Sequence, residues 1–153
     1  MLKTLLRWID IPPGWLALSA GAAWGLDALV PGLGFGWGWS RLVGDGLIAL
    51  GLGAMGLAFW EFLRARTSVI PRQVPTAFLK RGIYRLTRNP IYLGDAMVLV
   101  GLILHWDVLV ALPLVPAFAA LITRRFILGE EAGLIAQFGD EFIEWASKVR
   151  RWL

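Results

Sequence analysis

The chain has 153 residues, a net charge of +4 and a composition that is 58% hydrophobic but only 17% charged. A soluble domain carries about a quarter charged residues, and the core of a chain this short cannot enclose so much apolar surface. We therefore predict an integral membrane protein. The alternative is an unusually apolar soluble helical protein. The absence of cysteine and the single histidine exclude disulfides, thiolate metal sites, a cysteine nucleophile and multi-histidine zinc sites.

The first part of the chain predicts an interfacial segment and two membrane-spanning helices. The sequence MLKTLLRWIDIPPGW is typical of a short segment at the lipid headgroups, with Trp8 and Trp15 at the interface. Charge and proline interrupt its apolar run, which argues against a cleaved secretory signal. A first span is expected at 14–30, a Gly/Trp-rich interfacial loop at 31–41 and a second span at 42–62.

Four glycines of the second span predict close packing against a neighbouring helix; they are Gly46, Gly51, Gly53 and Gly56. A basic segment with three prolines covers 64–90 and is too polar to span a bilayer. Residues 91–126 then form about 36 apolar residues, or roughly 54 Å of helix, which exceeds the ~30 Å of one span. We therefore expect two helices that turn at 105–107, with Pro113 and Pro116 bending the second, and an amphipathic helix from residue 128.

The distribution of lysine and arginine predicts the topology. Of the 15 basic residues, only Arg41 falls in a connector that four spans would leave outside. The positive-inside rule therefore puts both termini and segment 64–90 in the cytoplasm. A single long third span would leave the basic tail outside, so we predict four spans. We then expect segment 64–90 and the tail 127–153 to meet at one membrane face.

The stretch GIYRLTRNPIYLG, from Gly82 to Gly94, combines polar and aromatic residues at the start of an apolar helix. Pro90 suits the first helical turn, where free amide groups can hold an electron-rich group. Tyr84 and Tyr92 offer flat faces and hydroxyl tips, and the two glycines would let a ligand approach the backbone. The alternative is a loop that anchors the chain to anionic lipid.

A second polar feature, RRFILGEEAGLIAQFGDEF, follows the last apolar stretch. Glu130 and Glu131 are not needed for anchoring, and their carboxylates could hold an ammonium or hydroxyl group of a ligand. The alternatives are a solvated acidic turn and, for Arg124 and Arg125, a simple membrane anchor. Asp95, one turn into the third span, faces either a pocket or the second span.

The combination of TRNPIYLG, an apolar hairpin, EE and FGDEF resembles the family of integral membrane methyltransferases that contains isoprenylcysteine carboxyl methyltransferase and the phospholipid methyltransferases. The likeness covers roughly residues 66–153, whereas residues 1–63 resemble the family only in being two spans. The resemblance implies one all-α membrane methyltransferase domain over 1–153, with S-adenosylmethionine in a cytoplasmic pocket over the last two spans. Asn89 departs from the pattern, because many members have a histidine at that position.

The resemblance also implies roles for single residues. The expected cofactor-binding residues are Leu79, Gly82, Tyr84, Arg88, Asn89, Pro90, Tyr92, Gly94, Glu130 and Glu131. Arg124 and Glu131 are expected to be catalytic, and Arg124 and Arg125 to meet the substrate, while no metal is expected. The implied partners are a lipophilic or lipid substrate and membrane lipids of a prokaryotic inner membrane, with no nucleic acid.

The residues themselves agree with methyl transfer as chemistry. Transfer from a sulfonium is a displacement in which the electrophile carries its own leaving group, so the protein must mainly position the reactants and exclude water. One histidine and no cysteine are enough for such a task. Two other functions stay open, namely a non-catalytic module whose basic face binds anionic lipid or a partner, and a reductase or transporter on the same scaffold.

Overall fold

The computed structural model describes residues 10–30, 32, 34–67 and 77–153. Within these residues every regular element is helical. In chain order the elements are α2 (Pro12–Leu29), α3 (Gly38–Ala65), the 3₁₀ turn η1 (Gly82–Arg85), α4 (Pro90–His105), the 3₁₀ turn η2 (Leu109–Ala111), α5 (Leu114–Ile122), the π-helical turn η3 (Thr123–Ile127), α6 (Leu128–Phe138) and α7 (Asp140–Lys148). The expected interfacial Trp8 and the prolines Pro71 and Pro75 lie outside the described residues.

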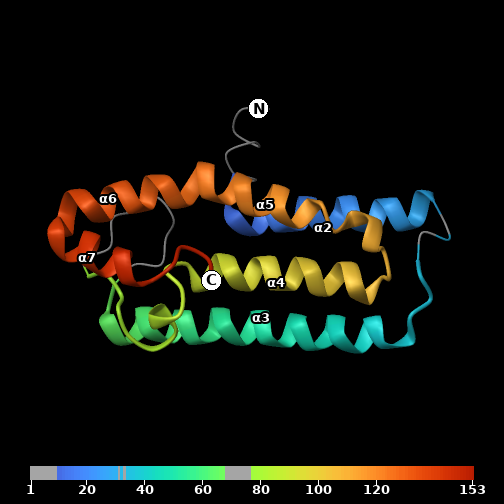
Figure 1. The fold of residues 1–153 in the computed structure, drawn as a ribbon, viewed down its shortest axis with the longest axis horizontal. Helices are drawn as coiled ribbons and strands as arrows, with labels where there is room; N and C mark the ends of the chain where they lie inside the picture. Colours follow the sequence, from blue (N-terminus) through green and yellow to red (C-terminus); the bar gives the residue numbers. More distant parts are fainter. Residues whose placement is uncertain (1–9, 31, 33, 68–76) are drawn as a thin grey trace.

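The long helices lie side by side and alternate in direction (Figure 1). The predicted turn at residues 105–107 is confirmed, because α4 ends at His105 and the chain folds back into η2 and α5. Asp107 has a positive φ of 56° at this turn, and its Oδ2 accepts a hydrogen bond from the amide of Gly36 at 2.7 Å. The turn is thereby attached to the connector between α2 and α3. His105 pairs with Asp45 at 2.6 Å beside it.

Two helical stretches among the described residues are long and apolar enough to cross a membrane, namely Gly38–Ala65 and Leu109–Phe138. The apolar helix Pro90–His105 is shorter than a usual span. The outer face of α3 carries exposed apolar side chains such as Leu42, which is 76% exposed, and Trp60, which is 59% exposed. Lipid is the solvent in which such a face is stable. Four crossings and their orientation stay a prediction.

Helices α3 and α4 pack through glycines that face each other. A Cβ atom at Gly51 would lie 2.7 Å from the carbonyl oxygen of Gly94, and one at Gly44 would lie 2.6 Å from that of Gly101. The backbones can approach this closely only because all four positions lack a side chain. The prediction of a glycine contact therefore holds for Gly51. The other three predicted glycines have nothing within 4 Å of such a Cβ atom; they are Gly46, Gly53 and Gly56.

The buried core lies between α4 and the α5–η3 stretch, where Leu99 and Ile103 pack with Ile122 and Phe126. The π-helical turn η3 was not expected from the sequence. Thr123, its first residue, donates its hydroxyl to the carbonyl of Ala119 at 2.7 Å. A π-turn inserts one residue into a helix, so the faces before and after it are rotated relative to each other.

Both predicted functional segments lie at one end of the helix bundle. Figure 1 shows the end of α3, the loop before α4, and the helices α6 and α7 grouped at the same end, with the carboxyl terminus beside the start of α4. The meeting of the segment before residue 90 with the tail after residue 127 is therefore confirmed for the residues that the structure describes. Its membrane side stays a prediction.

Candidate functional site

The loop before α4 is shaped by one glycine and one proline. Gly82 has a φ of +56° and touches Glu61 of α3, because a Cβ atom there would lie 2.7 Å from the Glu61 carboxylate. This backbone favours glycine, and it begins the 3₁₀ turn that buries Tyr84 against Phe62, with ring centroids 6.1 Å apart. Pro90 then occupies the first turn of α4, as its locked φ predicts.

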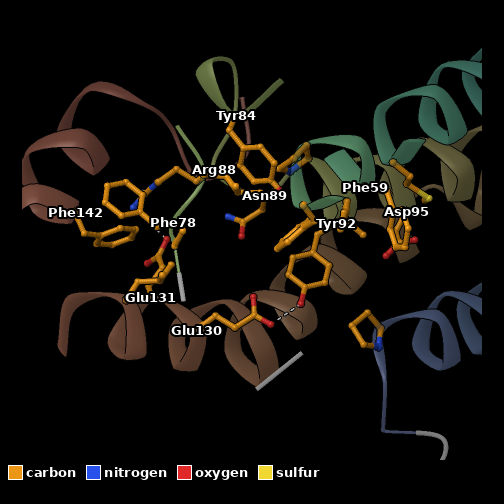
Figure 2. Close-up of a pocket in the computed structure, with 18 of the residues that line it drawn as sticks. Phe59, Phe78, Tyr84, Arg88, Asn89, Tyr92, Asp95, Glu130, Glu131 and Phe142 are labelled. Atoms are coloured by element: carbon orange, nitrogen blue, oxygen red, sulfur yellow. Dashed lines mark hydrogen bonds and ion pairs between the residues drawn. The ribbon is translucent and has the colours of Figure 1, made fainter. Parts of the chain in front are cut away.

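A cavity of about 530 Å³ lies between this loop, α3, α4, α6 and α7. The volume falls within the roughly 300–1,000 Å³ of small-molecule sites. Met55 and Phe59 of α3 and Leu134 of α6 give it an apolar side. Figure 2 shows the polar residues Tyr92 and Glu130 at its wall. The cavity can therefore accept a molecule that has both apolar and charged parts.

Tyr92 connects the two predicted motifs directly. Its hydroxyl donates a hydrogen bond to the Oε1 atom of Glu130 at 2.8 Å, and its ring is 7% exposed (Figure 2). Asp95, one turn further along α4, is 4% exposed and lines the same cavity. Of the two orientations left open for Asp95, the structure has the one toward the pocket. Burial, followed by the charges of Glu130 and Glu61, raises the pKa of Tyr84, so this phenol stays protonated at neutral pH.

Glu131 lies between two arginines. Its Oε1 atom is 3.1 Å from Nη1 of Arg88, and its two oxygens accept the Nε–H and Nη2–H groups of Arg151 at 3.1 and 2.6 Å. The Glu131 side chain is 13% exposed. The hydrogen bond to Glu131 raises the pKa of the Arg151 guanidinium. Arg88 lines the cavity, and among the described residues its Nε atom is buried without a hydrogen-bond partner.

Aromatic rings close the cavity on the side of α7. Phe78, from the loop, packs edge-on against Phe138 and Phe142 with centroid distances of 5.1 and 5.7 Å, and lies 5.5 Å from Trp145. Lys80 pairs with Glu141 and lies over the Phe78 ring. Phe78, Phe142 and Trp145 also line the cavity, which gives a flat ligand group aromatic surfaces to pack on.

The structure brings eight of the predicted site residues into the cavity wall. They are Leu79, Tyr84, Arg88, Asn89, Pro90, Tyr92, Glu130 and Glu131. Four others lie elsewhere; they are Gly82, Gly94, Arg124 and Arg125.

The four residues outside the wall have other surroundings. Gly82 contacts Glu61, and Gly94 contacts Gly51 in the interface between α3 and α4. Arg124 is exposed, and Arg125 pairs with Asp10 at 2.9 Å, with its guanidinium 5.3 Å from the Trp15 ring. Both arginines belong to η3, whose buried residues are the two that follow them, Phe126 and Ile127.

Sequence reasoning did not identify several residues around the cavity. Met55 and Phe59 lie in the predicted second span and Phe78 lies in the basic segment, where an apolar residue has no local mark of a binding site. Phe142 and Trp145 belong to the amphipathic region that the sequence predicts after residue 128, and both line the cavity. In the sequence, Arg151 shows only as one of the positive charges of the tail.

Comparison with known proteins agrees with this site. A profile of the phospholipid methyltransferase family matches residues 39–141, which include α3, the loop, α4, α5 and α6 and therefore both halves of the cavity. No curated protein and no solved structure matches the chain. The match covers more than half of the 153 residues, and it confirms the resemblance to membrane methyltransferases that the two motifs indicate. The chain therefore belongs to the phospholipid methyltransferase family, a family of membrane methyltransferases.

Proposed function

We propose that this protein transfers a methyl group from S-adenosylmethionine to a lipophilic acceptor at the cytoplasmic face of a prokaryotic inner membrane. The observation that carries the proposal is the shared cavity of the 82–94 motif and the glutamate pair, joined by the Tyr92–Glu130 hydrogen bond. The apolar side at Met55 and Phe59 suits the hydrocarbon part of an acceptor that arrives from the bilayer.

The groups in the cavity wall fit the cofactor. S-adenosylmethionine has a planar base, a ribose diol, an ammonium group, a carboxylate and a sulfonium. Phe78 and Tyr84 would hold the planar base, and Glu130 would accept hydrogen bonds from hydroxyl or ammonium groups. The Arg88 guanidinium, which lines the cavity and is 16% exposed, would serve the carboxylate. The ammonium and the carboxylate of the cofactor then each have a complementary group.

When bound, the cofactor supplies an activated methyl group together with its leaving group. The protein's task is then to align donor and acceptor and to exclude water, which the buried Tyr84 and Tyr92 and the apolar side of the cavity can do. Tyr84 acts as a neutral hydroxyl, because its raised pKa prevents it from being a base. A carboxylate acceptor needs no base, whereas an amine must lose a proton, which Asp95 or Glu130 can take up.

Binding of S-adenosylhomocysteine to the purified protein in nanodiscs, measured by calorimetry, tests the cofactor site. We expect Tyr92→Ala and Glu131→Gln each to weaken binding at least tenfold, since each removes a hydrogen bond or ion pair of the wall. Glu144→Gln is the matched control, because Glu144 is exposed on α7 and pairs only with Lys148 among the described residues. Unchanged binding in both site variants would refute the assignment.

The acceptor is identified by a second experiment. Membranes that contain the protein are incubated with S-adenosylmethionine carrying a deuterated methyl group, and their lipids are analysed by mass spectrometry. A labelled mass shift in one lipid class, lost in Tyr92→Ala, would identify the substrate class. Binding of anionic vesicles that falls steeply with salt, together with no affinity for S-adenosylhomocysteine, would instead support the non-catalytic module.

A further inference from the structure

The last residues of the chain fold back onto the loop before α4. Helix α7 ends at Lys148, and the following residues run beside the start of α4 (Figure 1). The amide of Arg88 donates to the carbonyl of Arg150 at 2.9 Å. The indole N–H of Trp152 donates to the hydroxyl of Thr123 at 3.2 Å, and its ring packs against the core. The tail is therefore attached to both the loop and the π-helical turn.

Arg151 contacts both halves of the proposed cofactor site. Its carbonyl oxygen accepts hydrogen bonds from the side-chain amide of Asn89 at 2.9 Å and from the hydroxyl of Thr87 at 3.2 Å. Its guanidinium makes the two-pronged contact with Glu131 at 3.1 and 2.6 Å. Arg151 itself is not part of the cavity wall, whereas Asn89 and Glu131 are. Arg151 can therefore act on a ligand through these two residues.

The Glu131 contact also separates the roles of the two glutamates. Glu131 is shared between two guanidinium groups, those of Arg88 and Arg151, so its charge is already compensated inside the protein. Glu130 receives the hydroxyl of Tyr92 and faces the cavity beside it (Figure 2). Glu131 is thus suited to hold the loop and α6 together, whereas Glu130 lies in the cavity wall with the Tyr92 hydroxyl bound to it.

We propose that Arg151 is a positioning residue of the cofactor site. Its guanidinium fixes the position of the Glu131 side chain, and its carbonyl fixes that of the Asn89 side chain. The inference rests on the proposed function and adds to it a residue that lies outside the cavity. It also accounts for asparagine at position 89. The role of this side chain is to donate one N–H group to the Arg151 carbonyl, and the ring N–H of a histidine can donate in the same way.

The test compares S-adenosylhomocysteine affinity in full-length variants. Arg151→Gln should weaken binding about tenfold, because Glu131 loses a partner that contacts both of its oxygens. Lys148→Gln is the control. It removes an equal charge from an exposed pair on α7 and should leave affinity unchanged. The double variant Glu131→Gln with Arg151→Gln should bind no more weakly than the weaker single variant, since both disrupt one contact. Additive losses would overturn the proposal.

A second pair of variants tests the carbonyl contact. Asn89→His should keep affinity within about threefold of the unsubstituted protein, and Asn89→Leu, which has no donor, should lose about tenfold. Equal affinities of these two variants would overturn the role of the Arg151 carbonyl. Thermal unfolding of every variant shows whether it is folded, and Arg151→Lys, which keeps the charge but not the fork, replaces Arg151→Gln if that variant does not fold.

The outcomes separate this inference from the function on which it rests. Absence of S-adenosylhomocysteine binding by the unsubstituted protein would overturn both. If the unsubstituted protein binds S-adenosylhomocysteine and Arg151→Gln binds it with the same affinity, only the positioning role is overturned.

Discussion

The glycine contact between α3 and α4 sets the distance between two walls of the cavity, so the substitution Gly51→Ala tests the architecture of the site. The added methyl group would lie 2.7 Å from the backbone carbonyl of Gly94. Backbone cannot rotate away as a side chain can, so α3 and α4 must separate by several tenths of an ångström. Gly94 follows Tyr92 by half a turn, so this separation reaches the cavity.

The magnitude follows from a matched comparison with Gly53→Ala. Both substitutions lie in the same helix and gain the same better helix propensity, worth about 1 kcal/mol. A Cβ atom at Gly53 meets nothing within 4 Å, so this variant shows the gain alone. Overpacking at Gly51 costs about 1–3 kcal/mol, and the difference between the two free energies of unfolding should have this size.

The assay is denaturant unfolding in mild detergent, followed by fluorescence of the nine tryptophans. We expect Gly51→Ala to unfold at lower denaturant than Gly53→Ala, and to bind S-adenosylhomocysteine more weakly at denaturant-free conditions. Equal free energies of unfolding for the two variants would refute the proposed close contact between the helices.

Three further predictions concern the cavity. Tyr92→Phe keeps the ring but removes the donor to Glu130, so S-adenosylhomocysteine affinity should fall about tenfold, and the same substitution should cost less in a Glu130→Gln background; independent effects in calorimetry would contradict the contact. Arg124→Gln and Arg125→Gln should leave this affinity unchanged, because neither arginine lines the cavity; a tenfold loss in either would show that the ligand reaches η3. In Tyr92→Phe only Tyr84 can ionise, and its tyrosinate absorbance should appear well above the ordinary pKa near 10. Because the pKa is raised in the folded state, Tyr84 contributes stability below pH ~10, and this contribution is lost as pH rises through the folded-state pKa. A titration midpoint near 10 would instead show an exposed phenol and contradict the prediction.

Some features of the site follow from local sequence. The apolar run from residue 91 is too long for one helix, and the polar break at His105 and Asp107 is the place where it turns. Pro90 marks the start of a helix because its ring locks φ and it lacks an N–H group. Once the hairpin is known, Tyr92 and Glu130 must lie at the same end, which the structure confirms with a hydrogen bond.

Other features depend on how far each helix is rotated about its own axis. Four glycines of the second span look equivalent in sequence, but of these four only Gly51 faces α4. Gly44, which no sequence pattern marks, faces α4 as well. The span is apolar on all sides, so hydropathy carries no signal of which face meets protein and which meets lipid. The partner helix decides it.

The sequence by itself determined the helical class, the hairpin after residue 90, the pairing of two motifs at one end and the family. These properties depend on composition, on helix-breaking residues and on the order of the segments. All three can be read along the chain without knowing which residues contact each other. Only the tertiary structure decided that Arg124 lies outside the cavity, that Glu131 is held by Arg88, and that Arg151 returns to the loop. These contacts join residues that are distant in the chain, and a π-helical turn before Glu130 changes which face each side chain occupies, so no local pattern contains them.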